Sequence, residues 1–263
     1  MPQSQGERAE AFRALHTGDP FVIPNPWDAG SARVLESLGA RALATTSGGF
    51  ALTLGRRDGE TSLDEVAEHV RSLAAVTDLP VSVDLENGYG AAPEDAAAAI
   101  ARVAEAGAVG GSIEDWDPSG ELYAIDHAAE RVAAAAEAAR ATGFPFVLTA
   151  RAENHIRGNP DLDDTIARLR AYEGAGADVL YAPGLRSTDE VRRVCEAVER
   201  PVNVLAHPGF ASIAEIAEAG AQRISVGGAL AYVAYGALAA AARELLGGGD
   251  DLSVLKPQAR LEL

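Results

Sequence analysis

Carboxylate side chains follow several short apolar segments of the sequence. Asp84 and Glu86 come at the end of VSVD and just beyond it, Glu114 ends GGSIE, and Asp58 lies in the polar stretch LGRRDGETS. Gathered at one edge of a fold, these carboxylates would repel one another unless a cation lay between them. Oxygen ligands suit a hard divalent ion that keeps several waters, Mg²⁺ or Mn²⁺. The pattern therefore predicts a metal site formed by Asp84, Glu86 and Glu114, whereas a single such residue would more often be ordinary solvated surface.

An arginine and a glycine-rich turn could bind a substrate anion beside that metal. Arg151 follows the run FVLTA, where it could clamp a carboxylate or neutralise a developing enolate oxygen. A surface ion pair is the alternative for this arginine. Ser47, Gly48 and Gly49 follow ALATT, and exposed backbone N–H groups there would form an anion-binding nest, unless SGG is an ordinary turn.

The remaining reactive side chains offer few catalytic options. His155 lies just past Arg151 and is a candidate acid or base, or equally a histidine that only stabilises its loop. His207 follows another apolar run, but HPG is also a common turn sequence. Cys195 falls on the apolar face of a helical segment and is interpreted as core packing. Lys256 is the single lysine and lies in the polar tail, which disfavours Schiff-base chemistry.

Eight short apolar runs alternate with helical patterns along the chain. The runs occupy residues 21–24, 42–46, 81–84, 110–114, 146–150, 179–183, 202–206 and 224–227. They are non-alternating and rich in β-branched residues, as expected for parallel strands buried on both faces. Leu-Gly-Ala at 38–40 and Ala-Gly-Ala at 106–108, 175–177 and 219–221 each precede a run, and glycine there would close a helix in the left-handed conformation.

This repetition predicts an α/β fold, a single (β/α)8 barrel domain over residues 1–263 with an N-terminal helix and a C-terminal helical extension. A doubly wound open sheet is the alternative. Barrel active sites lie at the carboxyl ends of the strands, where the candidate residues above are found. The C-terminal stretch 247–263 would be an extra helix used for packing between subunits, or a frayed tail.

Composition narrows the class of protein further. The chain has 263 residues, with 39 acidic against 22 basic side chains, and its net charge of −17 would repel nucleic acid and anionic membrane surfaces. One cysteine excludes an intramolecular disulfide and a cysteine-rich metal site. Residues 224–242 carry no charge, and we interpret them as a buried strand, a turn and a packed helix instead of a membrane span. The charged N-terminal segment lacks the pattern of a signal peptide, so a cytoplasmic protein is expected.

Five segments together resemble the isocitrate lyase/phosphoenolpyruvate mutase superfamily. They are PNPWDAGSARVLESLGARAL, TTSGG, VDLENGYG, SIED and TARAE, in the family's order along most of the chain. The resemblance implies a (β/α)8 barrel, often with a C-terminal helix exchanged between subunits of a homodimer or homotetramer. It implies Mg²⁺ held by Asp84, with Glu86, Glu114 and Asp58 contributing directly or through water.

The same resemblance implies a substrate class and its contacts. Substrates in this family are 2-oxo or 2-hydroxy carboxylates that react through an enolate. Ser47, Gly48 and Gly49 would hold the carboxylate or enolate end of such a substrate, and Arg151 would bind its carboxylate. Trp27 and Asp28 would line the pocket.

The chain departs from the family in its proton-transfer residues. The lyases carry a cysteine-containing loop after the fourth strand, and the mutases carry a lysine and an asparagine there, whereas this chain has WDPSGELYAIDH. A glutamate usually found after the sixth strand is replaced by YAPGL. Candidate substitutes are His155, Tyr123, Glu121 or a metal-bound water. Residues 116–127 would form a mobile loop that closes over the site.

These observations favour an Mg²⁺-dependent carbon–carbon lyase or decarboxylase acting on a 2-oxo acid. A C–P phosphonomutase is the first alternative, and decarboxylation is preferred to it because it needs the least dedicated acid/base machinery. The missing loop residues also allow a catalytically degenerate protein that only binds 2-oxo acids. A metal-dependent barrel aldolase, which also generates pyruvate enolate, is a further alternative.

Overall fold

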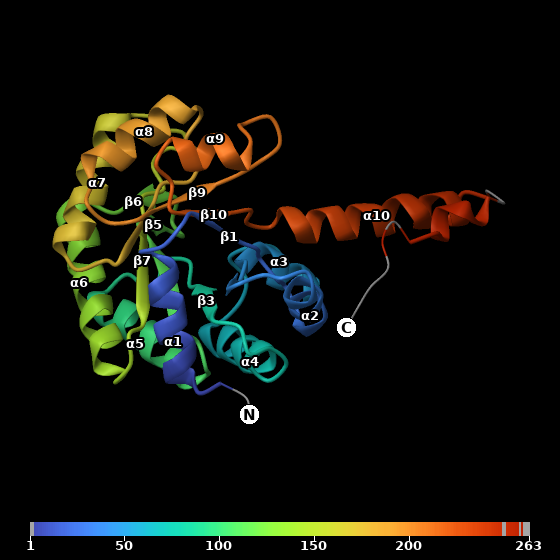
Figure 1. Cartoon of the computed structure of the whole chain (residues 1–263), viewed down its shortest axis with the longest axis horizontal. Coiled ribbons are helices and arrows are strands. Elements are labelled where there is room, and N and C mark those ends of the chain that lie inside the picture. The colour runs from blue at the N-terminus through green and yellow to red at the C-terminus, as the bar shows by residue number, and fades with distance from the viewer. Residues whose placement is uncertain (1–2, 249–250, 258, 260–263) are drawn as a thin grey trace.

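Eight parallel strands form one sheet that curves into a barrel surrounded by helices (Figure 1). The computed structural model describes residues 3–248, 251–257 and 259. The strands are β1 (Phe21–Ile23), β2 (Leu43–Ala44), β3 (Val81–Asp84), β4 (Gly110–Glu114), β7 (Val147–Arg151), β8 (Val179–Tyr181), β9 (Val202–Leu205) and β10 (Arg223–Ser225). All eight predicted strands are therefore confirmed.

The strand order identifies the sheet as a barrel. Neighbouring strands run β1-β10-β9-β8-β7-β4-β3-β2, which is the order of the chain followed round a circle. The two outer strands approach each other beyond their ends, where the Ala44 amide donates to the Pro24 carbonyl at 3.1 Å. The side-chain amide of Asn25 donates to the Thr45 carbonyl at 3.2 Å. The predicted (β/α)8 barrel is confirmed, and the doubly wound sheet is wrong because the strand order never reverses.

Helices surround the sheet, except that α10 projects away from it (Figure 1). They are α1 (Gln5–Leu15), α2 (Ala29–Ser37), α3 (Ser47–Thr53), α4 (Leu63–Ala74), α5 (Pro93–Glu105), α6 (Ile125–Ala141), α7 (Leu162–Gly174), α8 (Thr188–Ala197), α9 (Ile213–Glu218) and α10 (Ala229–Leu246), with a short 3-10 helix at Leu252–Leu255. Gly39, Gly107, Gly176 and Gly220 have φ angles of 88°, 111°, 106° and 109°. The predicted left-handed helix closures are confirmed at all four positions, and they return the chain to the start of the next strand.

The inside of the barrel is more polar than its outer layer. Arg223 is 5% exposed, and its guanidinium donates to the side chains of Asn203 and Thr149, both at 2.9 Å. Asn203 in turn donates to Ser225 at 3.0 Å. The apolar core lies instead between sheet and helices, where small residues of α5 and α6 allow close packing. The barrel interior can therefore hold polar groups beneath the carboxyl ends of the strands.

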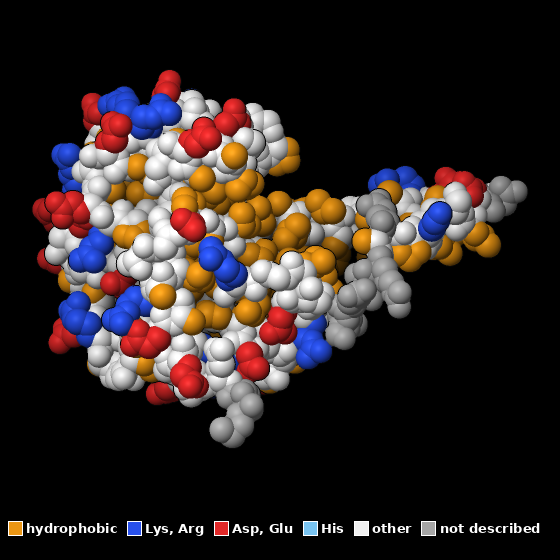
Figure 2. Space-filling view, in the orientation of Figure 1, with side chains coloured by type: hydrophobic (Ala, Val, Ile, Leu, Met, Phe, Trp, Pro, Cys, Tyr) orange, Lys and Arg blue, Asp and Glu red, His pale blue; other side chains and the backbone are white. Residues whose placement is uncertain are grey.

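Helix α10 does not pack against the barrel beyond its first turn. It projects as an arm (Figure 1), and Figure 2 shows hydrophobic side chains continuing along it from the body. Only 6% of its residues Ala229–Leu246 are buried. Judged by length and composition alone, this helix of the described chain is long and apolar enough to span a membrane. The predicted strand and turn at the start of residues 224–242 are confirmed, but the prediction of a packed helix is wrong. Within the described residues, the short 3-10 helix at Leu252–Leu255 lies against the arm, and most of its apolar side chains stay exposed.

Acid is expected to destabilise the fold through His16. Burial, followed by the charge of Arg223, lowers the pKa of His16 to about 3 from the ordinary value of 6.5. Between pH 7 and pH 5, His16 therefore becomes protonated in the unfolded chain but stays neutral in the folded chain. This difference should lower the free energy of unfolding by about 2 kcal/mol over that pH range. Burial also lowers the pKa of His69 to about 4, which adds to the same slope.

Urea unfolding of wild type, His16→Gln and His207→Gln at these two pH values measures the effect. His16→Gln should flatten the pH dependence, whereas the exposed control His207→Gln should not. An unchanged slope in His16→Gln would contradict the assignment of this proton uptake to His16.

Candidate active site

Two adjoining cavities open at the carboxyl ends of the strands. The inner cavity, of about 220 Å³, extends down into the polar barrel interior, and the outer cavity, of about 380 Å³, lies beneath the hairpin of β5 (Trp116–Asp117) and β6 (Glu121–Leu122). Both are lined by Ser47, Asp58 and Arg151. These three predicted site residues therefore lie where the two cavities meet.

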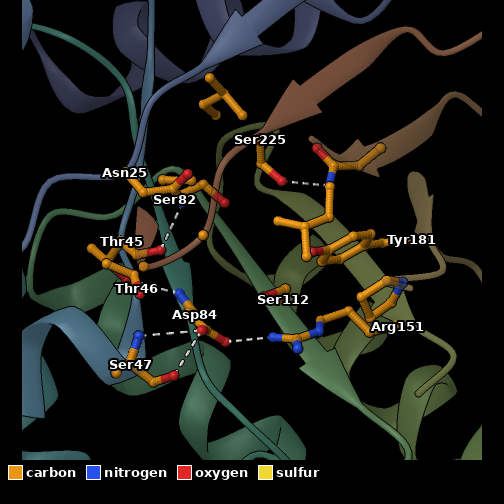
Figure 3. A pocket seen from close by; sticks show the side chains of 18 of the residues that line it. Asn25, Thr45, Thr46, Ser47, Ser82, Asp84, Ser112, Arg151, Tyr181 and Ser225 are labelled. Carbon is orange, nitrogen blue, oxygen red and sulfur yellow. Dashed lines mark hydrogen bonds and ion pairs between the residues drawn. The ribbon is translucent and has the colours of Figure 1, made fainter. Parts of the chain in front are cut away.

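Asp84, the last residue of β3, connects the first turn of α3 to Arg151 (Figure 3). One carboxylate oxygen, Oδ2, accepts from the backbone N–H and the hydroxyl of Ser47, at 3.2 and 3.0 Å. The other, Oδ1, accepts from Nη1 of Arg151 at 2.9 Å. The side-chain hydroxyl of Thr45 also accepts a hydrogen bond from the backbone N–H of Asp84 at 2.9 Å. The carboxylate is thus fixed on both sides, and its position at the strand end matches the prediction.

Arg151 lies at the centre of a buried charge cluster. Its guanidinium contacts carboxylate oxygens of Asp84, Glu114 and Glu153 at 2.9, 3.0 and 2.8 Å. Burial alone would lower the arginine pKa, but the three carboxylates raise it well above its ordinary value. The face of the Tyr181 ring lies 5.3 Å below the guanidinium carbon. Arg151 is therefore a permanent cation held in one orientation, as a carboxylate clamp requires.

Two carboxyl groups beside this cluster bind protons more tightly than usual. Burial, followed by the charges of Asp84 and Asp58, raises the pKa of Glu86 to about 7. Burial, reinforced by Glu153 and Asp84, raises the pKa of Glu114 to about 8 despite the two nearby arginines. Burial is the largest cause for both groups, and neighbouring negative charges add to it. A cation placed among these groups would stabilise their ionised forms.

The turn that presents Glu86 has an unusual backbone. Glu86 and Tyr89 have positive φ angles of 49° and 64°, a region that non-glycine residues seldom adopt. Arg131, buried on α6, donates to the backbone carbonyls of Asn87, Gly90 and Glu114. The turn is therefore held from beneath by a single side chain of a neighbouring helix.

Arg157 is a site residue that the sequence reasoning did not identify. It lines the outer cavity and contacts Glu114 and Glu153 at 3.3 and 3.2 Å. Its guanidinium carbon lies 4.6 Å from the centre of the Trp116 ring, so it connects the loop after β7 to the hairpin. The signal for this residue was weak, because it lies six positions past the strand end. The expected loop 116–127 is in part this two-stranded hairpin.

Behind the cluster, Asp115 is buried and fully hydrogen-bonded. It accepts from the backbone N–H of Glu153 at 2.8 Å, from Arg168 at 2.9 Å and from the Tyr172 hydroxyl at 2.5 Å. Asp115 therefore fixes the backbone of Glu153, which pairs with Arg151, and lines neither of the two cavities of the site.

Several predicted residues lie outside both cavities, which corrects those expectations. Asp28 caps the start of α2 by accepting from the Ser31 N–H at 2.7 Å, and Trp27 lies against the outside of α3, beside Gly49. His155 is buried against α7, with Nδ1 2.8 Å from the Thr165 hydroxyl. These predictions failed because the distance of a residue from a strand end does not determine the direction in which the following loop or helix turns its side chain.

Tyr123 and the start of α3 also differ from the expected arrangement. The Tyr123 ring lies over Arg131, and its hydroxyl accepts from Asn87 at 3.2 Å, so it packs behind the turn. Glu121 is exposed on the hairpin. Ser47, Gly48 and Gly49 form the first turn of α3 instead of a loop, with Thr46 as the capping residue. Ser47 and Gly48 line the inner cavity, with the hydroxyl and N–H of Ser47 contacting Asp84. Gly49 lines neither cavity, and its N–H donates to the Thr46 side chain at 3.3 Å, which corrects the prediction for this residue.

The carboxylates fit Mg²⁺ chemically, although they are not arranged as a preformed three-ligand site. Among the residues that the structure describes, no three Asp, Glu, His or Cys side chains are grouped to hold a metal ion. The reason is that Arg151 lies between Asp84 and Glu114. Mg²⁺ commonly binds one or two carboxylates and keeps its other waters. Asp84, Glu86, Glu114 and Asp58 supply oxygen donors of this kind, and a bound cation would offset the burial and the neighbouring negative charges that raise the pKa values of Glu86 and Glu114.

Comparison with known proteins places this geometry in a family. Residues 12–246 match the family model described as phosphoenolpyruvate phosphomutase. A solved structure from Burkholderia cenocepacia, described in general terms as a lyase/mutase, is 51% identical and superposes with a TM-score of 0.94, covering 97% of this chain and 94% of that one.

Curated relatives include enzymes with named reactions. The 2-methylisocitrate lyase of Halalkalibacterium halodurans is 31% identical over 77% of this chain and 68% of its own length. The oxaloacetate decarboxylase of a Bradyrhizobium species is 31% identical over 74% of this chain and 69% of its own length. With its barrel order, its strand-end carboxylates and these matches, the chain belongs to the isocitrate lyase/phosphoenolpyruvate mutase superfamily.

Proposed function

We propose that this protein is an Mg²⁺-dependent enzyme that cleaves a carbon–carbon bond next to the 2-oxo group of a carboxylate, through an enolate. Decarboxylation of a 2-oxo dicarboxylate is the simplest such reaction. The observation that carries the proposal is Arg151, whose side chain is 15% exposed and is held by three carboxylates beside a small polar cavity. A divalent cation among these acids would offset most of their negative charge, which favours binding of an anionic substrate to a chain of charge −17.

The residues divide the chemistry between them. Arg151 would release part of its contact with the carboxylates to bind the substrate carboxylate with two hydrogen bonds. Asp84, Glu86, Glu114 and Asp58 would hold Mg²⁺, which when bound polarises the oxo group. The N–H of Gly48, which lines the inner cavity, would stabilise the enolate oxygen. The half-buried Tyr181, which lines the inner cavity, would limit access of bulk water to the reacting end.

A substrate screen tests this proposal. Purified protein with Mg²⁺ is incubated with 2-oxo and 2-hydroxy di- and tricarboxylates and with phosphonopyruvate, and products are identified by ¹H and ³¹P NMR. Pyruvate from a carboxylate, lost when EDTA is added, supports the proposal. Turnover of phosphonopyruvate alone would instead favour the C–P phosphonomutase alternative, which the family also contains.

A protein that only binds 2-oxo acids is the second candidate function. The absence of the lyase cysteine and the mutase lysine from residues 116–127 supports it. Such a protein would be stabilised thermally by oxaloacetate and Mg²⁺ without forming product. Accumulation of product over time would contradict it.

We further propose that the cytoplasmic protein is a homodimer or homotetramer in which the α10 arm packs against another copy. Val233 and Leu238 are 68% and 63% exposed on this arm, and a second apolar surface would cover them. Leu238→Glu should shift the protein toward the monomer in analytical ultracentrifugation. Leu38→Glu, at the equally exposed end of α2, is the control and should not. A monomeric wild type would contradict the proposal.

A further inference from the structure

The first turn of α10 contributes a tyrosine to the mouth of the inner cavity. Tyr232 lines this cavity while 59% of the residue remains exposed to solvent. Its ring lies over Gly228, where a Cβ atom would be 2.8 Å from Cε2 of the ring. Its hydroxyl reaches Gly48, where a Cβ atom would be 3.3 Å away. Two glycines therefore make room for this side chain at the cavity.

The Tyr232 hydroxyl lies close to known parts of the site. The carboxylate oxygen Oδ2 of Asp58 is 3.4 Å from the same point above Gly48. Gly48 follows Ser47, whose hydroxyl contacts Asp84. A substrate bound between Arg151 and the start of α3 would thus have the phenol at its edge, with water on the other side of the ring.

Few other cavity-lining groups in the described chain could donate a proton at neutral pH. The arginines that line the cavities are Arg151, Arg157 and Arg223. Arg151 and Arg157 are paired with carboxylates and keep their protons. The guanidinium of Arg223 donates hydrogen bonds to side chains inside the barrel. Tyr181 is inside the barrel, and burial raises its pKa to about 12. The carboxylates are the proposed metal ligands, which bind in their ionised forms.

We propose that Tyr232 is the proton donor of the reaction, in place of the loop cysteine or lysine of the family, neither of which is present in residues 116–127. The proposal rests on the proposed function. As the carbon–carbon bond breaks and CO₂ leaves, its electron pair forms the enolate. The enolate carbon then takes the phenol proton, so that a C–H bond forms and the O–H bond breaks. The phenolate recovers its proton from water, to which its exposed face gives direct access.

The test compares Tyr232→Phe with Tyr235→Phe, a matched change on the same helix at a residue that lines neither cavity. Three quantities are measured with Mg²⁺: the rate of oxaloacetate decarboxylation, the exchange of the pyruvate methyl protons with D₂O, and the binding of oxalate as a planar dianion. Tyr232→Phe should lower decarboxylation and exchange about 100-fold. Oxalate binding should stay within about twofold of wild type, and Tyr235→Phe should match wild type throughout.

The outcomes separate the two proposals. Exchange at the wild-type rate in Tyr232→Phe would overturn the role of Tyr232 while leaving the proposed function in place. A loss of oxalate binding as large as the loss of exchange would do the same. Exchange by wild type without decarboxylation of any substrate would overturn the proposed function, and the Tyr232→Phe comparison would still test the donor. Absence of both reactions in wild type would overturn both proposals.

Discussion

Arg151→Lys is expected to lower kcat/KM for the 2-oxo acid substrate about 10³-fold while the barrel stays folded. Lysine keeps the positive charge that the buried carboxylates need, so it should avoid the cost of leaving them unpaired. A single ammonium group cannot contact Asp84, Glu114 and Glu153 while also clamping a carboxylate with two parallel hydrogen bonds. The loss should therefore fall on substrate binding and on stabilisation of the enolate.

Steady-state kinetics and thermal unfolding by circular dichroism measure the two sides of this prediction. Arg192→Lys is the control, because Arg192 forms only an exposed pair with Asp189 on α8. Wild-type kcat/KM in Arg151→Lys would show that the buried cluster is structural, and the proposed substrate clamp would have to be abandoned.

Arg131→Met should lower the free energy of unfolding by about 3 kcal/mol, because it leaves buried carbonyls without donors. Arg131 is 1% exposed and donates to the carbonyl of Glu114 at 3.1 Å and to that of Gly90 at 2.9 Å. It also holds the carbonyl of Asn87 and lies against the Tyr123 ring. Methionine fills much of the same volume but supplies none of these hydrogen bonds.

This substitution should also reduce activity, since the turn carrying Glu86 and Tyr89 would lose the contacts that hold its positive φ angles. Urea unfolding gives the stability change, with the exposed Arg140→Met of the same helix as control. An unfolding midpoint equal to that of Arg140→Met would contradict a structural role for Arg131.

The sequence was most informative where one local rule determines the structure. The run GGSIE became β4 without a change in its bounds, since a strand buried on both faces needs only a continuous apolar or small-residue run. Gly107 marked the end of α5 because only glycine readily takes its φ of 111°. Asp84 and Arg151 were placed correctly because parallel strands of a barrel end at the same edge.

The sequence was least informative where tertiary contacts override local preference. Gly48 and Gly49 are poor helix formers and indicated a turn, yet they belong to the first turn of α3. Gly49 lies close to Trp27 and Ala231, where a larger side chain would not fit. The apolar pattern of α10 predicted burial, but a pattern cannot tell whether the covering surface belongs to the same chain. Tyr232 reaches the cavity from that helix, so no strand-end rule pointed to it.

The most direct test of the central claim is Mg²⁺-dependent decarboxylation of oxaloacetate, measured as pyruvate formed in excess of the rate with the same concentration of Asp84→Asn protein. That reference removes decarboxylation by free Mg²⁺, because it retains the protein and the ion but loses the carboxylate that joins Ser47 to Arg151. The account predicts enzymatic pyruvate formation that EDTA abolishes and Mg²⁺ restores. Equal rates for wild type and Asp84→Asn across the 2-oxo and 2-hydroxy di- and tricarboxylates would contradict it.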